Sequence, residues 1–164
     1  MNTGHKIKYR SVPQDKFYTP IDLSSFLVPL VPFLREDTLF DPFKGKGAFF
    51  NCFPKGYKRD WAEIDEGYDF FEVKEKWDWL ISNPPYSCLD AVFEKSCQVA
   101  QKGFAYLLLG HALTPRRLAN IENLGFGLTK IHMCKVFKWY GISMFCVFEK
   151  GEKHIIDFDR KVWR

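Results

Sequence analysis

The sequence predicts a doubly wound α/β domain, in which helices cover both faces of a mostly parallel sheet. Short apolar segments typical of strands alternate along the chain with segments of helical spacing, as expected for parallel strands joined by right-handed crossovers. Two long β-like runs at 128–137 and 142–149 close the chain and predict a C-terminal antiparallel hairpin. The 164 residues suit one such domain.

Turn residues and apolar periodicity divide the chain into its elements. The apolar segment 21–34 predicts one helix or a pair of short helices, since two prolines interrupt it, and Asp22 or Ser24 is the expected N-cap. Residues 104–109 are uniformly apolar, as in a strand buried on both faces. The other strands are expected at 38–40, 57–64 and 77–82, and the other helices at 48–53, 87–101 and 115–123.

Composition favours a soluble, intracellular protein. Hydrophobic residues make up 46% of the chain, which is enough for a substantial core, and no apolar run approaches the roughly 20 residues of a membrane span. Residues 1–10 are polar and basic, unlike a signal peptide, so a cytoplasmic location is expected. The five cysteines lack metal-binding spacing, so we expect reduced, structural thiols and no metal site.

Basic residues form three small clusters on a chain whose net charge is +4. One belongs to residues 1–20, which we expect to form a basic arm, and another ends the chain at 160–164. The pair Arg116 and Arg117 is a candidate phosphate contact, in which case binding to a polyanion would weaken steeply with salt. A solvated surface is the ordinary alternative for each cluster.

A glycine loop follows the first expected strand. It reads Asp-Pro-Phe-Lys-Gly-Lys-Gly over 41–47, and its glycines allow a tight turn and a close approach of the backbone to a ligand. Phe50 stands where a dinucleotide loop has its third glycine, and no Walker sequence is present, so a ligand held by its phosphates is not expected. Glu63, about twenty residues further on, occupies the position that binds a ribose hydroxyl. A nucleoside with a charged, non-phosphate tail, such as S-adenosylmethionine (SAM), fits this set, and a plain structural turn is the alternative.

The most specific motif is Asn83-Pro84-Pro85-Tyr86, which ends the strand at 77–82. Its prolines lack amide hydrogens and stiffen the turn, so the motif presents two acceptors, the Asn83 side-chain oxygen and the Pro84 carbonyl, beside the ring of Tyr86. Acceptors that hold the hydrogens of an exocyclic amine favour the pyramidal nitrogen that attacks a sulfonium methyl, while the base stacks on the ring. Catalysis then consists mostly of positioning. A Pro-Pro turn that only ends a strand is the alternative.

Together these motifs resemble the SAM-dependent amino-methyltransferases that modify adenine N6 or cytosine N4. The resemblance covers about 16–150 and implies a Rossmann-like methyltransferase domain with a seven-stranded sheet over residues 1–164. It implies that the four residues of the tetrapeptide 83–86 are catalytic. The cofactor contacts that it implies are Phe17, Tyr18, Thr19, Pro20, Asp41, Pro42, Phe43, Gly45, Gly47, Glu63, Ile64, Asp69, Phe70 and Asn83.

The resemblance also assigns roles to these contacts. The segment 17–20 is similar to the part of the family that helps bind the methionine moiety, Glu63 would face the ribose and Ile64 the adenine, and Asp69 would lie near the amino group of the cofactor. The cofactor motifs precede the tetrapeptide, which is the order of many adenine enzymes.

The expected substrate is a base flipped out of DNA. The loop between the last two strands supplies Trp139 or Tyr140 as a second aromatic that would sandwich the base with Tyr86, with ordinary packing as the alternative. The family usually carries a separate target-recognition domain, for which this chain has no room, and in this it is similar to short, phage-encoded members. Recognition is then expected to come from loops, from a homodimer or partner subunit, or to be slight. A phage enzyme would act in the host cytoplasm.

Several acceptors stay open beside DNA adenine. RNA adenine, cytosine N4 and a protein glutamine amide would use the same chemistry, and asparagine at the first position of the tetrapeptide favours adenine or glutamine over cytosine. A hypothesis of another class is a non-catalytic subunit that has kept the methyltransferase fold and binds nucleic acid for an active partner. The intact loop and tetrapeptide argue against that hypothesis.

Overall fold

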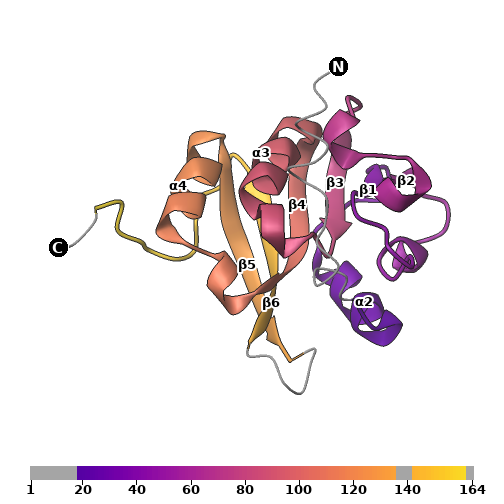
Figure 1. Ribbon diagram of the computed structural model, residues 1–164, viewed down its shortest axis with the longest axis horizontal. Helices are drawn as coiled ribbons and strands as arrows, with labels where there is room; N and C mark the ends of the chain where they lie inside the picture. The colour runs from indigo at the N-terminus through magenta and orange to yellow at the C-terminus, as the bar shows by residue number, and fades with distance from the viewer. Residues whose placement is uncertain (1–17, 136–141, 162–164) are drawn as a thin grey trace.

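Six strands form one mixed sheet in the computed structural model, which describes residues 18–135 and 142–161. Across the sheet their order is β2-β1-β3-β4-β6-β5 (Figure 1). Strands β1 to β4 run parallel, and β6 lies antiparallel between β4 and β5. The strands are β1 (Leu39–Asp41), β2 (Arg59–Trp61), β3 (Trp77–Ser82), β4 (Ala100–Leu109), β5 (Phe126–Cys134) and β6 (Ser143–Lys150).

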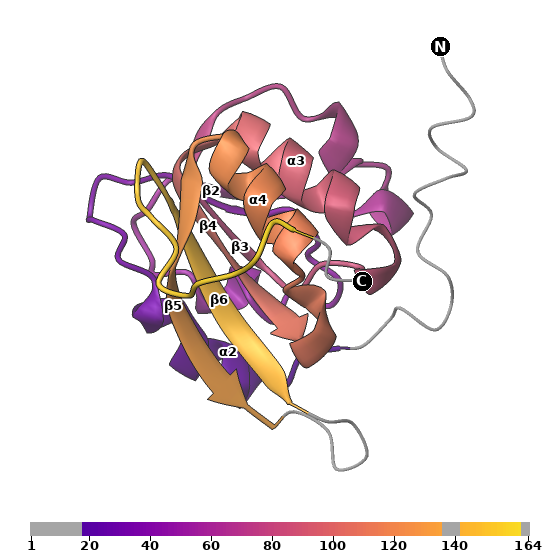
Figure 2. The same cartoon turned by 90° about the vertical axis from the view of Figure 1, so that its left-hand side faces the viewer.

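Helices cover both faces of this sheet, as a doubly wound fold requires (Figure 2). Helices α3 (Leu89–Val99) and α4 (Pro115–Asn123) lie on one face, and α2 (Ile21–Leu27) lies on the other. Because side chains alternate along a strand, Phe104 of β4 packs towards α3 and α4 while Leu107 packs towards α2. The chain is therefore a three-layered α/β domain with an apolar core on each side of the sheet. Within the described ranges, no helix is both long and apolar enough to span a bilayer.

The seven-stranded sheet that the resemblance implied is wrong for the described part of the chain, which has six strands. Between β2 and β3 the chain makes two 3-10 turns, η4 (Ile64–Glu66) and η5 (Phe70–Glu72), instead of a further strand. Each turn is capped by an acid: Glu63 accepts from an amide of η4, and Asp69 accepts from an amide of η5. These local bonds satisfy backbone donors that a strand would otherwise use.

Other expected boundaries need smaller corrections. The segment 21–34 forms a pair of short helices, α2 and the 3-10 turn η2 (Val28–Leu30), but its N-cap is Pro20, because Asp22 and Ser24 already lie inside α2. The helix expected at 48–53 is a 3-10 turn, η3 (Phe50–Cys52).

The C-terminal strands pair antiparallel, from Phe126↔Lys150 to Cys134↔Ser143, as the hairpin prediction required, although β6 inserts between β4 and β5. A segment after β6 then folds back along β5, which the sequence did not predict. The ring of His154 accepts a hydrogen bond from the Leu128 amide through Nδ1 and contacts the Leu118 carbonyl of α4 through Nε2. Residues 151–161 thereby cover one part of an edge strand, a common protection against strand pairing with other chains.

Candidate functional site

The glycine loop turns directly after β1, at the carboxyl edge of the sheet. Gly45 and Gly47 have φ angles of +52° and +85°, which L side chains rarely adopt. A Cβ atom on Gly47 would also lie 2.9 Å from Nδ2 of Asn51. These two positions therefore favour glycine for their backbone conformation, while the Asn51 amide, at the end of a flexible side chain, could turn away from a Cβ on Gly47.

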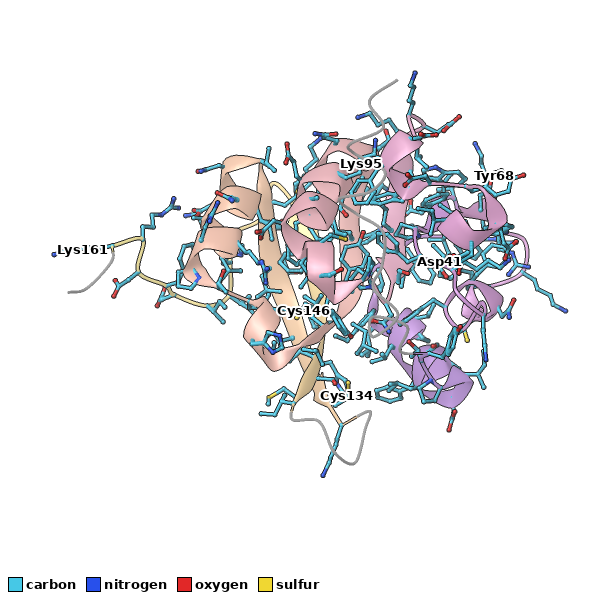
Figure 3. The ribbon with its side chains drawn as sticks, viewed as in Figure 1. Asp41, Tyr68, Lys95, Cys134, Cys146 and Lys161 are labelled. Carbon is cyan, nitrogen blue, oxygen red and sulfur yellow. The ribbon has the colours of Figure 1, made fainter. Side chains whose placement is uncertain are left out.

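Asp41, the last residue of β1, holds this loop from inside the protein (Figure 3). The residue is 1% exposed, and its Oδ1 accepts hydrogen bonds from the Ser82 hydroxyl at 2.6 Å and the Phe43 amide at 3.3 Å. Its Oδ2 accepts from the Phe50 amide at 3.1 Å. Burial raises the pKa of Asp41 to about 7, against these hydrogen bonds, which lower it. The sequence predicted a cofactor contact here, and the structure adds that the carboxylate organises the loop backbone.

Glu63 joins the end of β2 to the same loop. Its Oε2 accepts from the Gly45 amide at 2.7 Å and its Oε1 from the Asp65 amide at 3.2 Å. Ile64, the next residue, leaves 41% of its surface exposed and so offers an apolar face at this edge. Nearby, the Lys44 ammonium lies 3.7 Å from the ring centroid of Trp61. The acid and the apolar side chain thus stand side by side next to the glycine loop.

The third predicted cofactor segment contributes mainly to packing. Phe70 is 2% exposed and meets the ring of Phe43 edge-on at 5.2 Å. The Oδ1 of Asp69 accepts from the Phe71 amide at 2.9 Å and caps η5. Phe70 therefore supports the glycine loop from the core.

The tetrapeptide follows β3, the strand beside β1. The Asn83 amide is fixed at both ends: Nδ2 donates to the Thr19 hydroxyl at 3.2 Å, and Oδ1 accepts from the Tyr86 hydroxyl at 2.9 Å. Tyr86 also lies 3.4 Å from the Leu107 carbonyl. Pro84 is buried, whereas Asn83 and Tyr86 are half-buried. Two side chains from different segments thus set the direction of the amide.

The segment before α2 reaches both motifs. Thr19 contacts Asn83, as described above, and the Tyr18 ring lies under the Lys46 ammonium, 4.1 Å from its centroid. A Cβ on Gly45 would lie 3.9 Å from that ring. The structure therefore brings residues 18–20, the glycine loop and the tetrapeptide to one edge of the sheet.

Of the predicted substrate contacts, Tyr86 lies in the tetrapeptide, whereas Arg116 and Arg117 lie on α4. Arg117 donates to Asp90 at 2.7 Å and to the Ala112 carbonyl at 2.9 Å, so it ties α4 to α3 and to the preceding turn. Arg116 is exposed, and both arginines line a pocket of about 380 Å³ between these two helices. Phe17 and the candidate aromatics Trp139 and Tyr140 lie outside the described residues.

Ser82 is a site residue that the sequence did not single out. It is fully buried, and besides Asp41 its hydroxyl contacts the Phe43 carbonyl at 3.3 Å. Its sequence pattern is a serine that closes an otherwise apolar strand just before the tetrapeptide. Across 18–135 and 142–161, no group of three or more His, Cys, Asp or Glu is placed to hold a metal ion.

Comparison with known proteins identifies the fold. No family model and no curated protein matches the sequence. Among solved structures, the E. cuniculi Mtq2–Trm112 complex, responsible for methylation of the eRF1 translation termination factor, aligns with 83% of this chain and 99% of the matched chain, with 13% identity and a TM-score of 0.63. A methyltransferase from Pyrococcus furiosus aligns with 82% of this chain and 84% of its own, with 18% identity and a TM-score of 0.61.

A third solved structure carries a ligand. Magnesium protoporphyrin IX methyltransferase from Synechocystis PCC 6803, with bound SAM, aligns with 79% of this chain and 77% of its own, with 13% identity and a TM-score of 0.60. The fold of the chain is therefore that of SAM-dependent methyltransferases. The substrates named for these proteins differ, a porphyrin in one and a termination factor in another, so the fold does not select an acceptor.

Proposed function

We propose that this chain is a SAM-dependent methyltransferase that transfers a methyl group to the exocyclic N6 of adenine in DNA. The observation that most supports this function is the hydrogen bond between Asp41 and Ser82, because it joins the glycine loop to the strand that delivers Asn83. Ligands of doubly wound folds bind at the carboxyl ends of neighbouring strands. Here β1 and β3 are such neighbours, and each ends in one of the two motifs.

The residues at this edge fit SAM as the cofactor. The glycine loop lets backbone approach a ligand closely, and Glu63 and Ile64 offer a carboxylate and an apolar face beside it. Asp41 is a buried acid whose pKa is raised to about 7; a positive charge nearby would lower that pKa and be stabilised by the carboxylate form. When bound, SAM supplies a methyl group on a positively charged sulfonium.

We assign the cofactor contacts by position. Glu63 would receive the ribose hydroxyls and Ile64 the adenine, while Tyr18 and Thr19 would hold the methionine end. Asp41 would act from behind the loop, through the amides of Phe43 and Phe50 and through its charge. Asp69 supports the segment around Phe70 and is a weaker candidate for direct contact, since its carboxylate caps η5.

The tetrapeptide would position the acceptor. The Asn83 oxygen and the Pro84 carbonyl accept the two hydrogens of the amine, and the ring of Tyr86 offers a face on which the base stacks. Thr19 and Tyr86 support this role, because they hold the amide with its nitrogen towards Thr19 and its oxygen towards Tyr86. The proton of the amine leaves to solvent after methyl transfer, so the residues supply position and electrostatics without a strong base.

A protein glutamine amide is the second candidate acceptor. Mtq2–Trm112 methylates a translation termination factor, and the present chain aligns with nearly all of the chain it matches there. A side-chain amide is planar and has an NH₂ group, so the same two acceptors would receive it. Because that protein is found in a complex with Trm112, a partner subunit is one source of substrate recognition for the present chain as well.

Labelled SAM, incubated with unmethylated DNA, RNA and a glutamine-containing protein extract in parallel, tests the function. Digestion to nucleosides followed by mass spectrometry should give N6-methyldeoxyadenosine from the DNA. If N4-methyldeoxycytidine forms instead, the mechanism stands but the substrate base is cytosine. If the label appears in protein alone, the result supports methylation of a glutamine amide. Failure to bind SAM in calorimetry would contradict an enzymatic role and support the non-catalytic subunit.

A further inference from the structure

Ser82 occupies a junction between the two motifs. It is the last residue of β3, it is fully buried, and the next residue in the chain is Asn83. Its hydroxyl donates to Oδ1 of Asp41 at 2.6 Å, a short distance typical of a hydroxyl bound to a carboxylate. The bond crosses from β3 to β1, whose residues Leu39 and Phe40 pair with Trp79 and Leu80.

Asp41 extends this junction into the glycine loop. Its Oδ1 also accepts the amide of Phe43, at the start of the loop, and its Oδ2 accepts the amide of Phe50, just after it. Both ends of the loop are therefore bound to one carboxylate, and Ser82 fixes that carboxylate to the strand carrying the tetrapeptide. A change in the direction of the Asp41 side chain would move the loop relative to Asn83.

We propose that Ser82 is a positioning residue: its hydroxyl fixes the Asp41 carboxylate, and through it the glycine loop, at the distance from Asn83 that methyl transfer requires. The proposal rests on the proposed function, since it takes the loop to hold SAM. Displacements of about 1 Å at a reacting centre can cost about a hundredfold in rate. The fully buried Ser82–Asp41 hydrogen bond suits this role. A hydrogen bond is strong in a low-dielectric interior, and removing one partner leaves the other buried and unsatisfied at a high cost in free energy.

The electrostatics of Asp41 support this role. Burial raises the pKa of Asp41 to about 7, the Ser82 hydroxyl is the largest of the hydrogen bonds that lower it, and Glu63 at the end of β2 raises it. The Lys44 ammonium, which belongs to the glycine loop, pairs with Glu66 at 2.7 Å rather than with Asp41. Removal of the hydroxyl therefore raises the pKa of Asp41 further, so that less carboxylate is present near neutral pH to hold the two loop amides.

The test uses an isosteric pair at the same position. Thr and Val have nearly the same shape, so Ser82→Thr and Ser82→Val place the same extra methyl in the core and differ in the hydroxyl. Ser82→Ala removes the hydroxyl without added volume. Ser96→Ala is the matched control, because Ser96 is also fully buried and its hydroxyl lies 2.6 Å from that of the buried Tyr106 on β4.

Three measurements follow for each variant: melting temperature, amide hydrogen exchange over 42–51 in the ligand-free protein, and the dissociation constant for SAM between pH 6 and 8.5. We expect Ser82→Val and Ser82→Ala to exchange faster in the loop and to bind SAM about ten- to a hundredfold more weakly. Their affinity should also rise with pH around a higher midpoint than in the wild type. Ser82→Thr should stay near the wild type, and Ser96→Ala should lose stability without these changes.

The outcomes separate the two proposals. If the wild type binds SAM but Ser82→Val matches Ser82→Thr in loop exchange, affinity and pH midpoint, the positioning role is wrong and the proposed function stands. If the wild type does not bind SAM, the proposed function is wrong, and the positioning role of Ser82, which depends on it, is also wrong. If Ser82→Ala does not fold, the Thr and Val pair decides, since both variants carry the same steric change.

Discussion

Two buried aspartates flank strand β1, Asp37 just before it and Asp41 as its last residue. Each accepts three hydrogen bonds from described donors, but the donors differ. Asp37 receives the Leu34 amide, the Trp79 indole and the Lys102 ammonium, whereas the described donors to Asp41 are two amides and a hydroxyl, all neutral. One end of the strand therefore has a paired charge, and the other has an acid with neutral donors.

The pKa values reflect this difference. Burial alone would raise the pKa of Asp37, but its hydrogen bonds and the attraction of Lys102 together lower it. At Asp41 burial prevails and raises the pKa to about 7. An acid neutralised by a lysine can anchor the fold, whereas a buried acid with neutral donors is suited to the cationic cofactor that we propose. The comparison therefore separates an edge of the sheet with a neutralised acid from the edge where we propose that the cofactor binds.

The largest expected effect is at the edge where we propose the active site. Asn83→Ala removes an acceptor that the proposed mechanism uses during methyl transfer, so the single-turnover rate should fall about a hundred- to a thousandfold. Affinity for SAM should fall far less than the rate, because the loop and Glu63 are untouched and, on the cofactor side, the Asn83–Thr19 hydrogen bond is what is lost. Rapid-quench assays and calorimetry measure the two quantities. Near-normal turnover in this variant would contradict the mechanism.

The next largest effects come from replacing each of the two buried aspartates, Asp37 and Asp41, with alanine. Asp37→Ala leaves the Leu34 amide and the Trp79 indole without their acceptor and should cost about 2–4 kcal/mol of unfolding free energy, with SAM affinity unchanged. Asp41→Ala should weaken SAM binding about tenfold or more, because both ends of the glycine loop lose their acceptor. Urea denaturation and calorimetry on the two variants check the contrast. Equal effects on SAM affinity would remove the distinction between the two edges.

Much of the scaffold can be predicted from the sequence, because hydrophobic periodicity specifies it. The apolar run at 104–109 and the helical spacing after 87 correspond to β4 and α3. The glycine loop and the tetrapeptide are also visible, since glycine and proline have strong backbone requirements. Their juxtaposition follows from β1 pairing with β3.

Other features depend on contacts that no local pattern encodes. The strand expected at 57–64 ends at Trp61, and Glu63 instead caps η4. The His154 contacts bring the C-terminal segment onto β5. Ser82 resembles any serine in an apolar strand until its distance to Asp41 is known. Such long-range hydrogen bonds between buried polar groups leave no periodicity in the sequence, so the structure is needed to find them.

A more gradual effect, spread over several pH units, is the pH dependence of stability. The folded pKa of Asp41, about 7, lies above the unfolded value of 3.8, so its favourable contribution is complete below pH 3.8 and is lost as pH rises through about 7. Asp37 has the opposite sign, since its lowered pKa gives stability above its unfolded value that is lost as pH falls. With these two values the loss from Asp41 should be roughly 3–4 kcal/mol between pH 4 and 8. Urea denaturation of Asp41→Asn across this range should show a flatter profile than the wild type, and an unchanged slope would assign the pH dependence to other groups.

The smallest effect is a proton released when the cofactor binds. A bound sulfonium and ammonium would lower the pKa of Asp41 from about 7, so near pH 7 binding should release on the order of half a proton. Affinity for SAM should then rise with pH between 6 and 8. Calorimetry in phosphate and in Tris, whose ionisation enthalpies differ, measures the release directly. Asp41→Asn should abolish it and Asp37→Asn should not, because only the acid at the carboxyl end of β1 titrates in this range. Equal release in the wild type and in Asp41→Asn would place the linked proton on another group and break the contrast between the two ends of the strand.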